Sequence, residues 1–382
     1  MKILLLNYEF PPMGGGAANA TFNIAKELVK LGHSVDVLTS RLKDQSKEEV
    51  IHGFNVYRVF SWRKGIHDCG IRGAFTYLWN AYFKLRHLLR HKHYDICHYF
   101  FSLPTGFLTL LPGKHRDIPY IISLRGSDVP SYDIDNQCIE VLHYPLKPVT
   151  RRIWRKAKYV IALSNGLRDL ALKIAPDQEI QVIGNGIETD VFIPRGDHQK
   201  NSGGLHLISV ARLIKRKGLQ HILQALHELN DPSIKLSIVG SGNYEKKLML
   251  LSESLGLKES VTFYGYCPRE ELSALYRRAD VFILPSLSES FGIVFAEAMS
   301  SGLPIIGSRV GGIPDLVKQE NGILVSPGNV QKIKNAIVTF KNDADLMASM
   351  SKANRERVLQ YYAWHCVAEQ YDQYYKLSSP RL

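Results

Sequence analysis

The sequence lacks both the long apolar runs and the paired cysteines that mark membrane-spanning and disulfide-stabilised proteins. No stretch of its 382 residues approaches the ~20 consecutive apolar residues that a transmembrane helix needs. The apolar run at residues 3–6 is too short for the h-region of a signal peptide, so we expect it to form a strand. No C-x-x-C pair occurs among the five cysteines, which are Cys69, Cys97, Cys138, Cys267 and Cys366. These absences argue against a zinc site or a disulfide framework and favour a cytosolic globular protein with reduced thiols.

A dinucleotide-binding fingerprint and a nucleic-acid-binding motif are also missing. The loop after the first expected strand has the sequence GGGAAN at residues 14–19, whereas the fingerprint requires G-x-G-x-x-G with an acidic residue ~20 positions on. The glycines still allow the backbone to approach a ligand, and their N–H groups can form a nest for an anion. The formal net charge of +12 suits an anionic partner, such as a nucleic acid, a membrane surface or a phosphorylated substrate. Because no nucleic-acid motif accompanies the charge, we predict no nucleic-acid partner, but charge alone does not choose between the other two.

One stretch, residues 281–302, has the pattern of a strand, a polar loop and a helix. The apolar run VFIL predicts a buried parallel strand that ends at Pro285, and a helical pattern extends from about Phe291 to a stop at Gly302. The first N–H groups of such a helix point at whatever lies beyond the carboxyl end of the strand. That place suits a phosphate.

Glu289 and Glu297 flank the start of this helix, with seven residues between them. One carboxylate can hold the hydroxyls of a sugar and the other those of a ribose, both away from the phosphates, which would repel them. A plainer interpretation is that Glu289 caps the loop and that Glu297 is a solvated helix residue. Spacing alone leaves both interpretations open.

Other segments extend this pattern along the chain. E-SFGIVFA-E is followed by PIIGSRVGGIPDLV and NGILVSPGN, and SVARLIKRKGL precedes it. Together they resemble the E-x7-E and R-x4-K-G signatures, and the neighbouring segments, of family 4 glycosyltransferases, which are retaining enzymes of the GT-B type. The resemblance covers nearly the whole chain, from the GGGA loop to the region of Trp364. It implies an α/β protein with the GT-B fold, in which two Rossmann-like parallel-sheet domains face a central cleft.

The alternation of predicted strands and helices agrees with two such domains. We expect an N-terminal acceptor-binding domain at residues 1–188 and a C-terminal domain for the nucleotide-sugar donor at residues 189–363. The polar, turn-rich segment 190–204 is the expected interdomain connection. By resemblance, the final helix, about residues 364–382, returns to the N-terminal domain.

The resemblance also implies roles for individual residues. Glu289 would contact the hydroxyls of the donor sugar, and Glu297 those of the ribose. Arg212 and Lys217 would stabilise the charge of the leaving diphosphate, as a divalent metal does in other transferases. Backbone groups at the helix start, from Phe291 through Gly292 and Ile293 to Val294, would approach the phosphates. Gly15 and Gly16 of the glycine loop would approach them as well. Gly242 and Tyr266 would border the nucleobase.

We expect neither a metal nor a cofactor. A D-x-D pattern occurs at Asp133 and Asp135, but it lies in a polar stretch of the acceptor half and not in a suitable loop. The resembled family usually has H-G-x-D where this chain has Arg125 followed by Gly-Ser-Asp. Arginine stays protonated, so Arg125 is unsuited to be a general base and fits better as a contact to a phosphate or a sugar oxygen. His98, at a strand end, is expected to be a satisfied core or rim histidine.

Two basic runs occur in the N-terminal half. One lies between Lys84 and Lys92 in an expected helix at residues 74–93, and the other, residues 147–159, has six Lys or Arg; neither contains an acidic residue. Because Trp79 and Trp154 accompany the two runs, they can form a surface for an anionic membrane. The alternative is that they are solvated helix faces whose apolar sides pack into the core.

We therefore predict a retaining, metal-independent, hexosyltransferase-type glycosyltransferase. It would move a sugar from a UDP- or GDP-sugar to a hydroxyl of a glycan or a lipid-linked acceptor, in bacterial cell-surface polysaccharide or glycolipid biosynthesis. It would act in the cytoplasm, peripherally on the inner face of the cytoplasmic membrane. By resemblance, the β-phosphate draws the acceptor proton during attack on the front face, so no enzymic nucleophile is needed.

Three alternatives stay open. In a glycosidase, Glu289 and Glu297 would be the carboxyl pair across one bond, which leaves Arg212 and Lys217 unused. A sugar-nucleotide 2-epimerase shares the architecture, but its family lacks the two signatures in this arrangement. A non-catalytic nucleotide- or membrane-binding module is supported only by the basic charge and by the change to Arg125.

Overall fold

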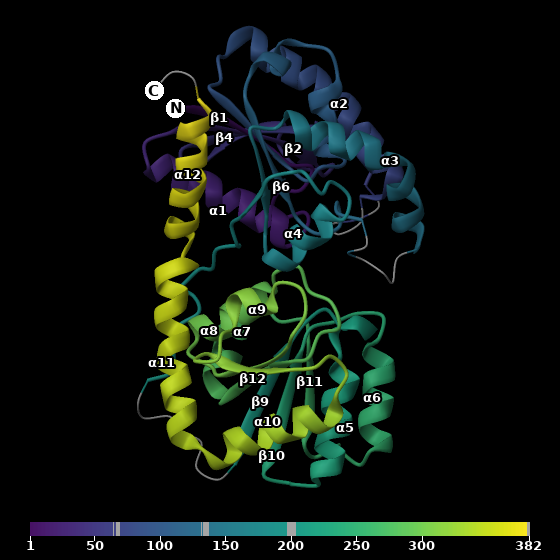
Figure 1. The fold of residues 1–382 in the computed structure, drawn as a ribbon, viewed down its shortest axis with the longest axis vertical. Coiled ribbons are helices and arrows are strands. Elements are labelled where there is room, and N and C mark those ends of the chain that lie inside the picture. Colours follow the sequence, from purple (N-terminus) through teal and green to yellow (C-terminus); the bar gives the residue numbers. More distant parts are fainter. Residues whose placement is uncertain (64, 66–68, 131, 133–136, 197–203, 380–382) are drawn as a thin grey trace. The chain divides into compact units, whose positions relative to one another are not determined.

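The fold is that of a computed structural model, and it consists of two compact units (Figure 1). The structure describes residues 1–63, 65, 69–130, 132, 137–196 and 204–379, without the side chains of residues 137–143. Unit 1 comprises Met1–Gly186 and Trp364–Leu382, and unit 2 comprises Ile187–Ala363. None of the described helices is long and apolar enough to cross a membrane.

Unit 1 contains an eight-stranded sheet in which every neighbouring pair is parallel except β3 and β4. Its strands, in sheet order, are β3 (Glu48–Ile51), β4 (Phe54–Phe60), β2 (Ser34–Arg41), β1 (Lys2–Leu6), β5 (Ile96–Phe100), β6 (Tyr120–Leu124), β7 (Tyr159–Ala162) and β8 (Ile180–Val182). The central strands β5 and β6 are buried along their whole length because helices cover both faces of the sheet.

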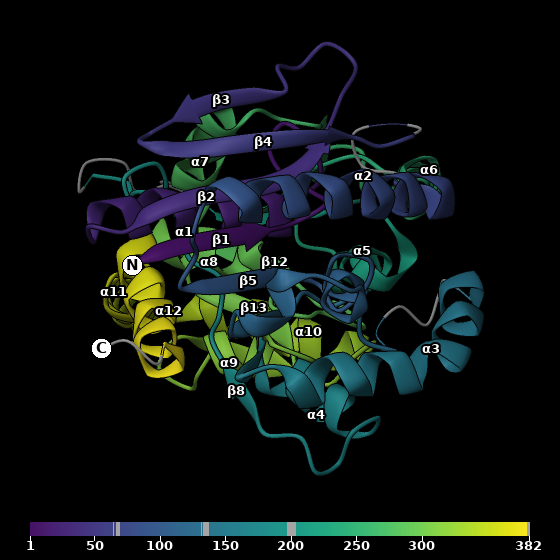
Figure 2. The same ribbon diagram turned by 90° about the horizontal axis from the view of Figure 1, so that it is seen from above.

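The helices of unit 1 form two layers. α1 (Gly16–Lys30) and α12 (Trp364–Ser378) lie on one side of the sheet, and α2 (Gly70–His91) and α3 (Gln137–Lys156) lie on the other (Figures 1 and 2). The short elements η1 (Thr105–Leu110), η2 (Lys114–Asp117) and α4 (Asn165–Leu172) complete the unit.

The last helix belongs to the core of unit 1. Its buried residues Trp364, Val367, Tyr371 and Tyr375 recur at steps of three and four, which places them on one face of the helix. They pack in one cluster with strand and helix residues from the start of the chain, among them Ile3.

Unit 2 contains a six-stranded parallel sheet. Its strands, in sheet order, are β11 (Val261–Gly265), β10 (Ile234–Val239), β9 (Leu205–Val210), β12 (Val281–Leu284), β13 (Ile305–Ser308) and β14 (Gly322–Val325). The accompanying elements are η3 (Lys215–Lys217), α5 (Leu219–Leu229), α6 (Glu245–Ser254), α7 (Arg269–Arg278), α8 (Ile293–Ser300), α9 (Ile313–Leu316), α10 (Val330–Asn342) and α11 (Ala344–Tyr361). The chain therefore has the two Rossmann-like parallel sheets that the sequence predicts.

The connection between the units differs from the prediction. The division falls between Gly186 and Ile187, whereas the sequence suggested a connection at residues 190–204 and a boundary after residue 188. The Ile187 N–H donates to the carbonyl of Tyr362 (2.7 Å), and Phe192 is fully buried within unit 2. Residues 197–203 of the expected connection lie outside the described residues, and the buried Phe192 holds the described part of the segment against unit 2.

Candidate functional site

The predicted donor residues of unit 2 lie in loops at the carboxyl edge of its sheet. β9 lies between β10 and β12. The chain therefore passes from β9 to β10 and β11 on one side of β9, and afterwards to β12, β13 and β14 on its other side. Such a switch point separates the loops at the carboxyl ends and is where open α/β sheets bind ligands. Three backbone hydrogen bonds join the loops there: Leu213 N–H to Ser241 O (2.9 Å), Leu287 N–H to Arg216 O (2.7 Å) and Gly312 N–H to Glu289 O (3.0 Å).

Lys217 and Glu289 meet at this switch point. Lys217 ends the short turn η3 after β9, and Glu289 lies in the loop after β12. The Lys217 ammonium donates to a Glu289 carboxylate oxygen at 2.5 Å, and the two side chains are 14% and 8% exposed. The pair thus presents one strongly held cation and one anion where solvent screening is weak.

Two glycines with positive φ hold the loops around this pair at close range. At Gly218 (φ +75°), an added Cβ would lie 2.1 Å from the carbonyl oxygen of Pro285. At Gly311 (φ +52°), an added Cβ would lie 1.7 Å from the carbonyl oxygen of Glu289. Both positions therefore need glycine for conformation and for space, and both fix the loop that carries Glu289.

The start of α8 lies directly after this loop. Gly292 caps the helix in the left-handed conformation (φ 83°, ψ 67°), without a side-chain cap. Phe291 is buried at 2% exposure, and Ile293 and Val294 form the first helical turn. Backbone N–H groups in a first turn have no acceptor within their own helix, so this turn offers donors and the positive end of the helix dipole to an anion.

Glu297 is buried, and the solvated interpretation is wrong. Its side chain accepts a hydrogen bond from the hydroxyl of Tyr276 (3.1 Å) and is 7% exposed. Burial raises the pKa of Glu297 to about 7, and the nearby Arg269 acts in the opposite direction. Arg269 is itself ion-paired with Glu188, with one contact of 2.8 Å. The carboxylate is thus oriented and able to change its charge near neutral pH.

The other predicted donor residues border the same edge. Arg212 follows β9 and has an exposed side chain. Gly242 follows β10, and an added Cβ there would lie 2.3 Å from the carbonyl oxygen of Leu213, so the loops after β9 and β10 pack backbone to backbone. Tyr266 follows β11 and is 79% exposed. The predicted roles of these residues stay predictions.

The predicted glycine loop of unit 1 lies at the carboxyl end of β1. α1 begins at Gly16 and is capped by Gly15. An added Cβ at either glycine would meet no atom within 4 Å. The protein's own packing therefore does not require glycine at these two positions, and the first turn of α1 is sterically open.

Arg125, at the end of β6, is held inside unit 1. Its guanidinium donates to Asn185 Oδ1 (2.8 Å) and to the hydroxyl of Tyr371 (3.4 Å), and it lies over the ring of Phe100 at 4.6 Å. The residue is 7% exposed. These contacts link the loop after β6 to α12, and a contact of Arg125 to a phosphate or a sugar oxygen stays a prediction.

His98 is a satisfied core histidine, as predicted. It is fully buried, with Nδ1 2.6 Å from the Tyr375 hydroxyl and Nε2 2.7 Å from Ser123 Oγ. Burial lowers its pKa well below the ordinary value, so the ring is neutral and structural.

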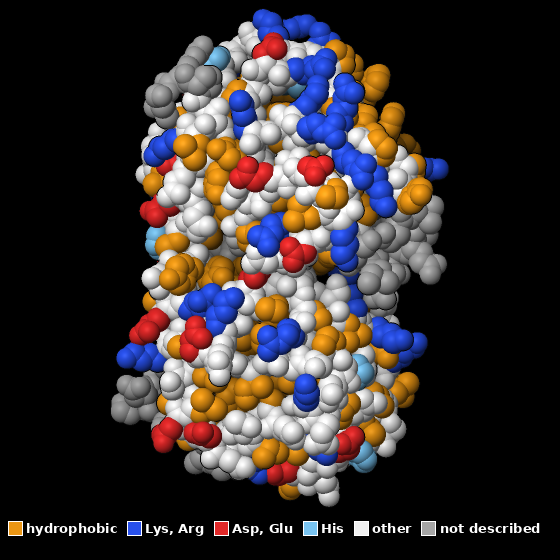
Figure 3. Space-filling model, in the orientation of Figure 1, with side chains coloured by type: hydrophobic (Ala, Val, Ile, Leu, Met, Phe, Trp, Pro, Cys, Tyr) orange, Lys and Arg blue, Asp and Glu red, His pale blue; other side chains and the backbone are white. Residues whose placement is uncertain are grey.

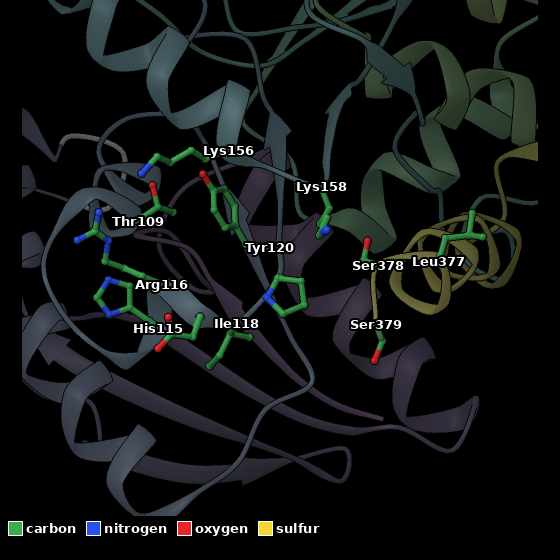
Figure 4. Close-up of a pocket in the computed structure, with 12 residues that line it drawn as sticks. Thr109, His115, Arg116, Ile118, Tyr120, Lys156, Lys158, Leu377, Ser378 and Ser379 are labelled. Carbon is green, nitrogen blue, oxygen red and sulfur yellow. The ribbon is translucent and has the colours of Figure 1, made fainter. Parts of the chain in front are cut away.

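A cavity of about 570 Å³ lies elsewhere, at the amino-terminal edge of the unit 1 sheet (Figure 4). Its walls include Tyr120, the first residue of β6, together with Lys156 and Ser378, the last residues of α3 and α12. Lys156, Lys158 and Arg116 make the wall basic. The positive charge of Lys156 offsets the negative end of the α3 dipole, so the presence of a lysine there has a structural explanation. This edge is opposite to the one at which such sheets bind substrates.

Within the described ranges, no three His, Cys, Asp or Glu side chains gather as a metal site would require. Asp133 and Asp135, which form the D-x-D pattern, lie outside the described residues. Independence from metals stays a prediction.

Comparison with known proteins identifies the class. Residues 192–357 match the family model described as Glycosyl transferases group 1, and residues 14–191 match Glycosyltransferase Family 4. An uncharacterised glycosyltransferase of Methanocaldococcus jannaschii is 30% identical over 397 residues, covering 99% of this chain and 98% of that protein.

Two solved structures are similar over their full length. The sucrose-phosphate synthase of Thermosynechococcus elongatus has a TM-score of 0.83 at 23% identity, covering 99% of this chain and 98% of that chain. Anabaena HepE in complex with UDP and glucose has a TM-score of 0.75 at 22% identity, covering 99% and 100%. The fold and these matches define a glycosyltransferase of GT-B fold. The chain belongs to the glycosyltransferases whose two halves are described by the family 4 and group 1 models.

Several residues of the site were not predicted from the sequence. Tyr276 of α7 donates a hydrogen bond to Glu297, and Arg269 of the same helix places a positive charge near it. Glu188, from a distant segment, is ion-paired with Arg269. No sequence motif links these positions, because only the packing of α7 beside α8 brings them together. Gly218 could have been found from the K-G step, and Gly311 from the V-G-G-I turn, since each ends a loop where positive φ is common.

Proposed function

We propose that this glycosyltransferase is a retaining, metal-independent enzyme that uses a UDP- or GDP-sugar as donor. Its acceptor is a hydroxyl of a glycan or of a lipid-linked sugar, in bacterial cell-surface polysaccharide or glycolipid biosynthesis. The observation that carries this proposal is the buried Lys217–Glu289 pair beside the first turn of α8.

The pair supplies the two kinds of contact that a nucleotide sugar needs. The Lys217 ammonium and the first N–H groups of α8 stabilise the diphosphate, whose negative charge grows as it leaves. The Glu289 carboxylate accepts hydrogen bonds from sugar hydroxyls. Arg212, exposed at the same edge, adds a second cation for the phosphates. These fixed positive groups take the place of a metal in the proposed reaction.

The remaining donor contacts follow the same geometry. Glu297, oriented by Tyr276, binds ribose hydroxyls. Gly242 and Tyr266 border the nucleobase, and the open glycines Gly15 and Gly16 let the first turn of α1 approach the diphosphate. HepE, a structural neighbour, is described in complex with UDP and glucose, which supports a nucleotide-sugar donor here.

The reaction exchanges one bond at the anomeric carbon on a single face of the sugar. The bond from C1 to the β-phosphate oxygen breaks, and the acceptor oxygen bonds to C1 from the same face. The proton of the acceptor hydroxyl passes to a β-phosphate oxygen, so that the products are the glycoside and a nucleoside diphosphate. Lys217 and the α8 N–H groups favour this path because they bind the leaving group more tightly as its charge rises.

We further propose that the enzyme works at the inner face of the cytoplasmic membrane. The support is the concentration of basic residues on α2 and α3, two helices that cover one side of the unit 1 sheet (Figure 2). Such charge attracts the anionic cytoplasmic leaflet by about 1 kcal/mol per Lys or Arg near the surface.

The decisive experiment combines radiolabelled UDP- and GDP-sugars with a membrane extract. Transfer with retained anomeric configuration, determined by NMR of the product, supports the proposal. Inverted configuration, release of free sugar, epimerised donor or no reaction would each contradict it and would point to the corresponding alternative activity. A thermal-shift screen across the same donors identifies the base and the sugar beforehand.

A further inference from the structure

α2 carries a stripe of exposed apolar side chains in addition to its buried face. Tyr77, Ala81, Leu85 and Leu88 are buried against the sheet. Four other side chains of the helix are exposed at successive steps of four residues: Ile71 (74%), Phe75 (66%), Trp79 (60%) and Phe83 (50%). Phe75 therefore lies on the side of the helix away from the buried Tyr77.

The stripe is continuous and extends onto the neighbouring segment. At about 100° per residue, its four members cover an arc of ~120° on the outer surface of the helix. The Trp79 and Phe83 rings are in edge-on contact, with centroids 5.2 Å apart. Phe60 (52% exposed) and Trp62 (61% exposed) lie beside the helix, because Asn80 bonds the carbonyl of Phe60 and Thr76 accepts from the Trp62 N–H. We call these six residues the aromatic stripe.

The charges around the stripe are all positive within α2. The helix contains Arg72, Lys84, Arg86 and Arg90 and no acidic residue. Arg72, Arg86 and Arg90 are exposed and, by the same helical periodicity, lie on the same outer face as the stripe. The exposed Arg151, Arg152, Arg155 and Lys156 of α3 are on the same side of the sheet. Figure 3 shows a line of Lys and Arg with hydrophobic side chains beside it over this part of unit 1.

We propose that the outer face of α2 binds an anionic lipid bilayer, with the aromatic stripe seated at the boundary between headgroups and acyl chains. Trp settles at that depth because its ring is buried while the indole N–H stays hydrated, and the neighbouring Phe and Ile side chains are buried at the acyl boundary. The flanking arginines then lie level with anionic headgroups. A contiguous exposed patch of this kind is otherwise a liability for a monomeric protein.

The inference deepens the proposed function and rests on it for its purpose, since it explains how the enzyme reaches a lipid-linked acceptor. Its test is independent of catalysis. The full-length protein, without donor, is mixed with vesicles of phosphatidylcholine or of phosphatidylcholine containing phosphatidylglycerol, and bound protein is measured by flotation. UDP and GDP binding is measured in parallel by calorimetry, so loss of the donor site and loss of membrane binding give different results.

The variants separate apolar insertion from attraction by charge. Trp79→Ser with Phe83→Ser should lower the partition onto anionic vesicles by about tenfold or more, because the apolar contact is lost. Arg72→Glu with Arg86→Glu should lower binding and reduce its dependence on salt. A matched control, Met249→Ser with Leu250→Ser, changes two exposed apolar residues of α6 in unit 2 and should leave binding unchanged.

Tryptophan fluorescence reports the insertion directly. Trp62 and Trp79 are exposed, whereas Trp154 and Trp364 are buried. Anionic vesicles should therefore shift the emission to the blue, and Trp79→Phe should keep binding while it reduces the shift. Failure of the wild-type protein to float with anionic vesicles at low salt would overturn the proposal. So would self-association in solution that the Trp79→Ser and Phe83→Ser changes abolish without any effect on vesicles, since the occupant of the face would then be a second copy.

Discussion

Replacing Lys217 with methionine would keep most of the aliphatic stem and remove the ammonium that lies 2.5 Å from Glu289. A lost charge-assisted contact to the diphosphate costs about 1.5–3 kcal/mol, equivalent to an affinity loss of about 10- to 150-fold. Because both side chains are largely buried, the Glu289 carboxylate would then face the phosphates unscreened. We therefore expect a loss toward the upper end of this range.

Isothermal titration with UDP and GDP measures this effect without the sugar, so the proposed role of Glu289 toward sugar hydroxyls does not enter. Lys217→Met should weaken nucleotide binding by a factor toward the upper end of the range of about 10- to 150-fold. Glu289→Gln alone should not weaken it. The double variant should bind better than Lys217→Met, because the repelling carboxylate is gone. The two single variants and the double variant form a double-mutant cycle, in which two side chains in direct contact commonly show a coupling energy of about 0.5–3 kcal/mol.

A matched control exists in the same unit. Lys334 and Glu228 form an ion pair at 2.9 Å between α10 and α5, so Lys334→Met removes a paired ammonium away from the loops of the site. It should leave nucleotide binding unchanged. Wild-type affinity in Lys217→Met, with cooperative urea unfolding retained, would refute the assignment of Lys217 to the diphosphate.

Four further predictions follow from the same contacts. Arg212→Ala should lower transfer at least about tenfold with folding retained, and near-normal turnover would remove this residue from the site. Transfer should survive excess EDTA; a complete loss that Mg²⁺ or Mn²⁺ restores would reveal a metal requirement. Gly311→Ala places a Cβ 1.7 Å from the Glu289 carbonyl oxygen and should lower both the Tm and donor affinity, whereas Gly256→Ala, at a similar φ of +72° but in open space, should lower only the Tm. Burial raises the pKa of Glu297 to about 7, above its unfolded value, so the folded state binds this proton more tightly. The contribution of Glu297 to stability is therefore greatest below its unfolded pKa and is lost as pH rises toward about 7. Urea unfolding of Glu297→Gln should show a weaker fall in stability across this range, and an unchanged fall would contradict the assignment.

The strands and the overall class could be predicted because they depend on local patterns. Apolar runs such as residues 281–284 give buried parallel strands, and the steps of three and four from Trp364 to Tyr375 give a helix with one apolar face. Lys217 and Glu289 lie close together because they follow the neighbouring parallel strands β9 and β12, and their roles toward a donor stay predictions.

Other features depend on tertiary packing, which a single sequence does not reveal. Glu297 has the spacing of a solvated helix residue, but α7 covers it and supplies Tyr276. Phe75 has the spacing of a core residue on α2, but the helix has two apolar faces and the sheet covers only the one that contains Tyr77. Periodicity identifies an apolar face and does not say which face the rest of the chain covers.

The return of α12 to unit 1 makes unit 2 an insertion within the chain of unit 1. A ribosome completes all strands of unit 2 before it makes Trp364, Tyr371 and Tyr375, which fill the core beside Ile3. Unit 2 can therefore fold first, while the part of unit 1 that has already been synthesised still has an uncovered apolar face. An added Cβ at Gly186 would lie 2.3 Å from the Trp364 ring, so the two ends of the insertion are adjacent. Unit 1 could therefore be produced alone by joining residues 1–186 to 364–382 through a short linker, whereas residues 1–186 by themselves would lack a side of their core.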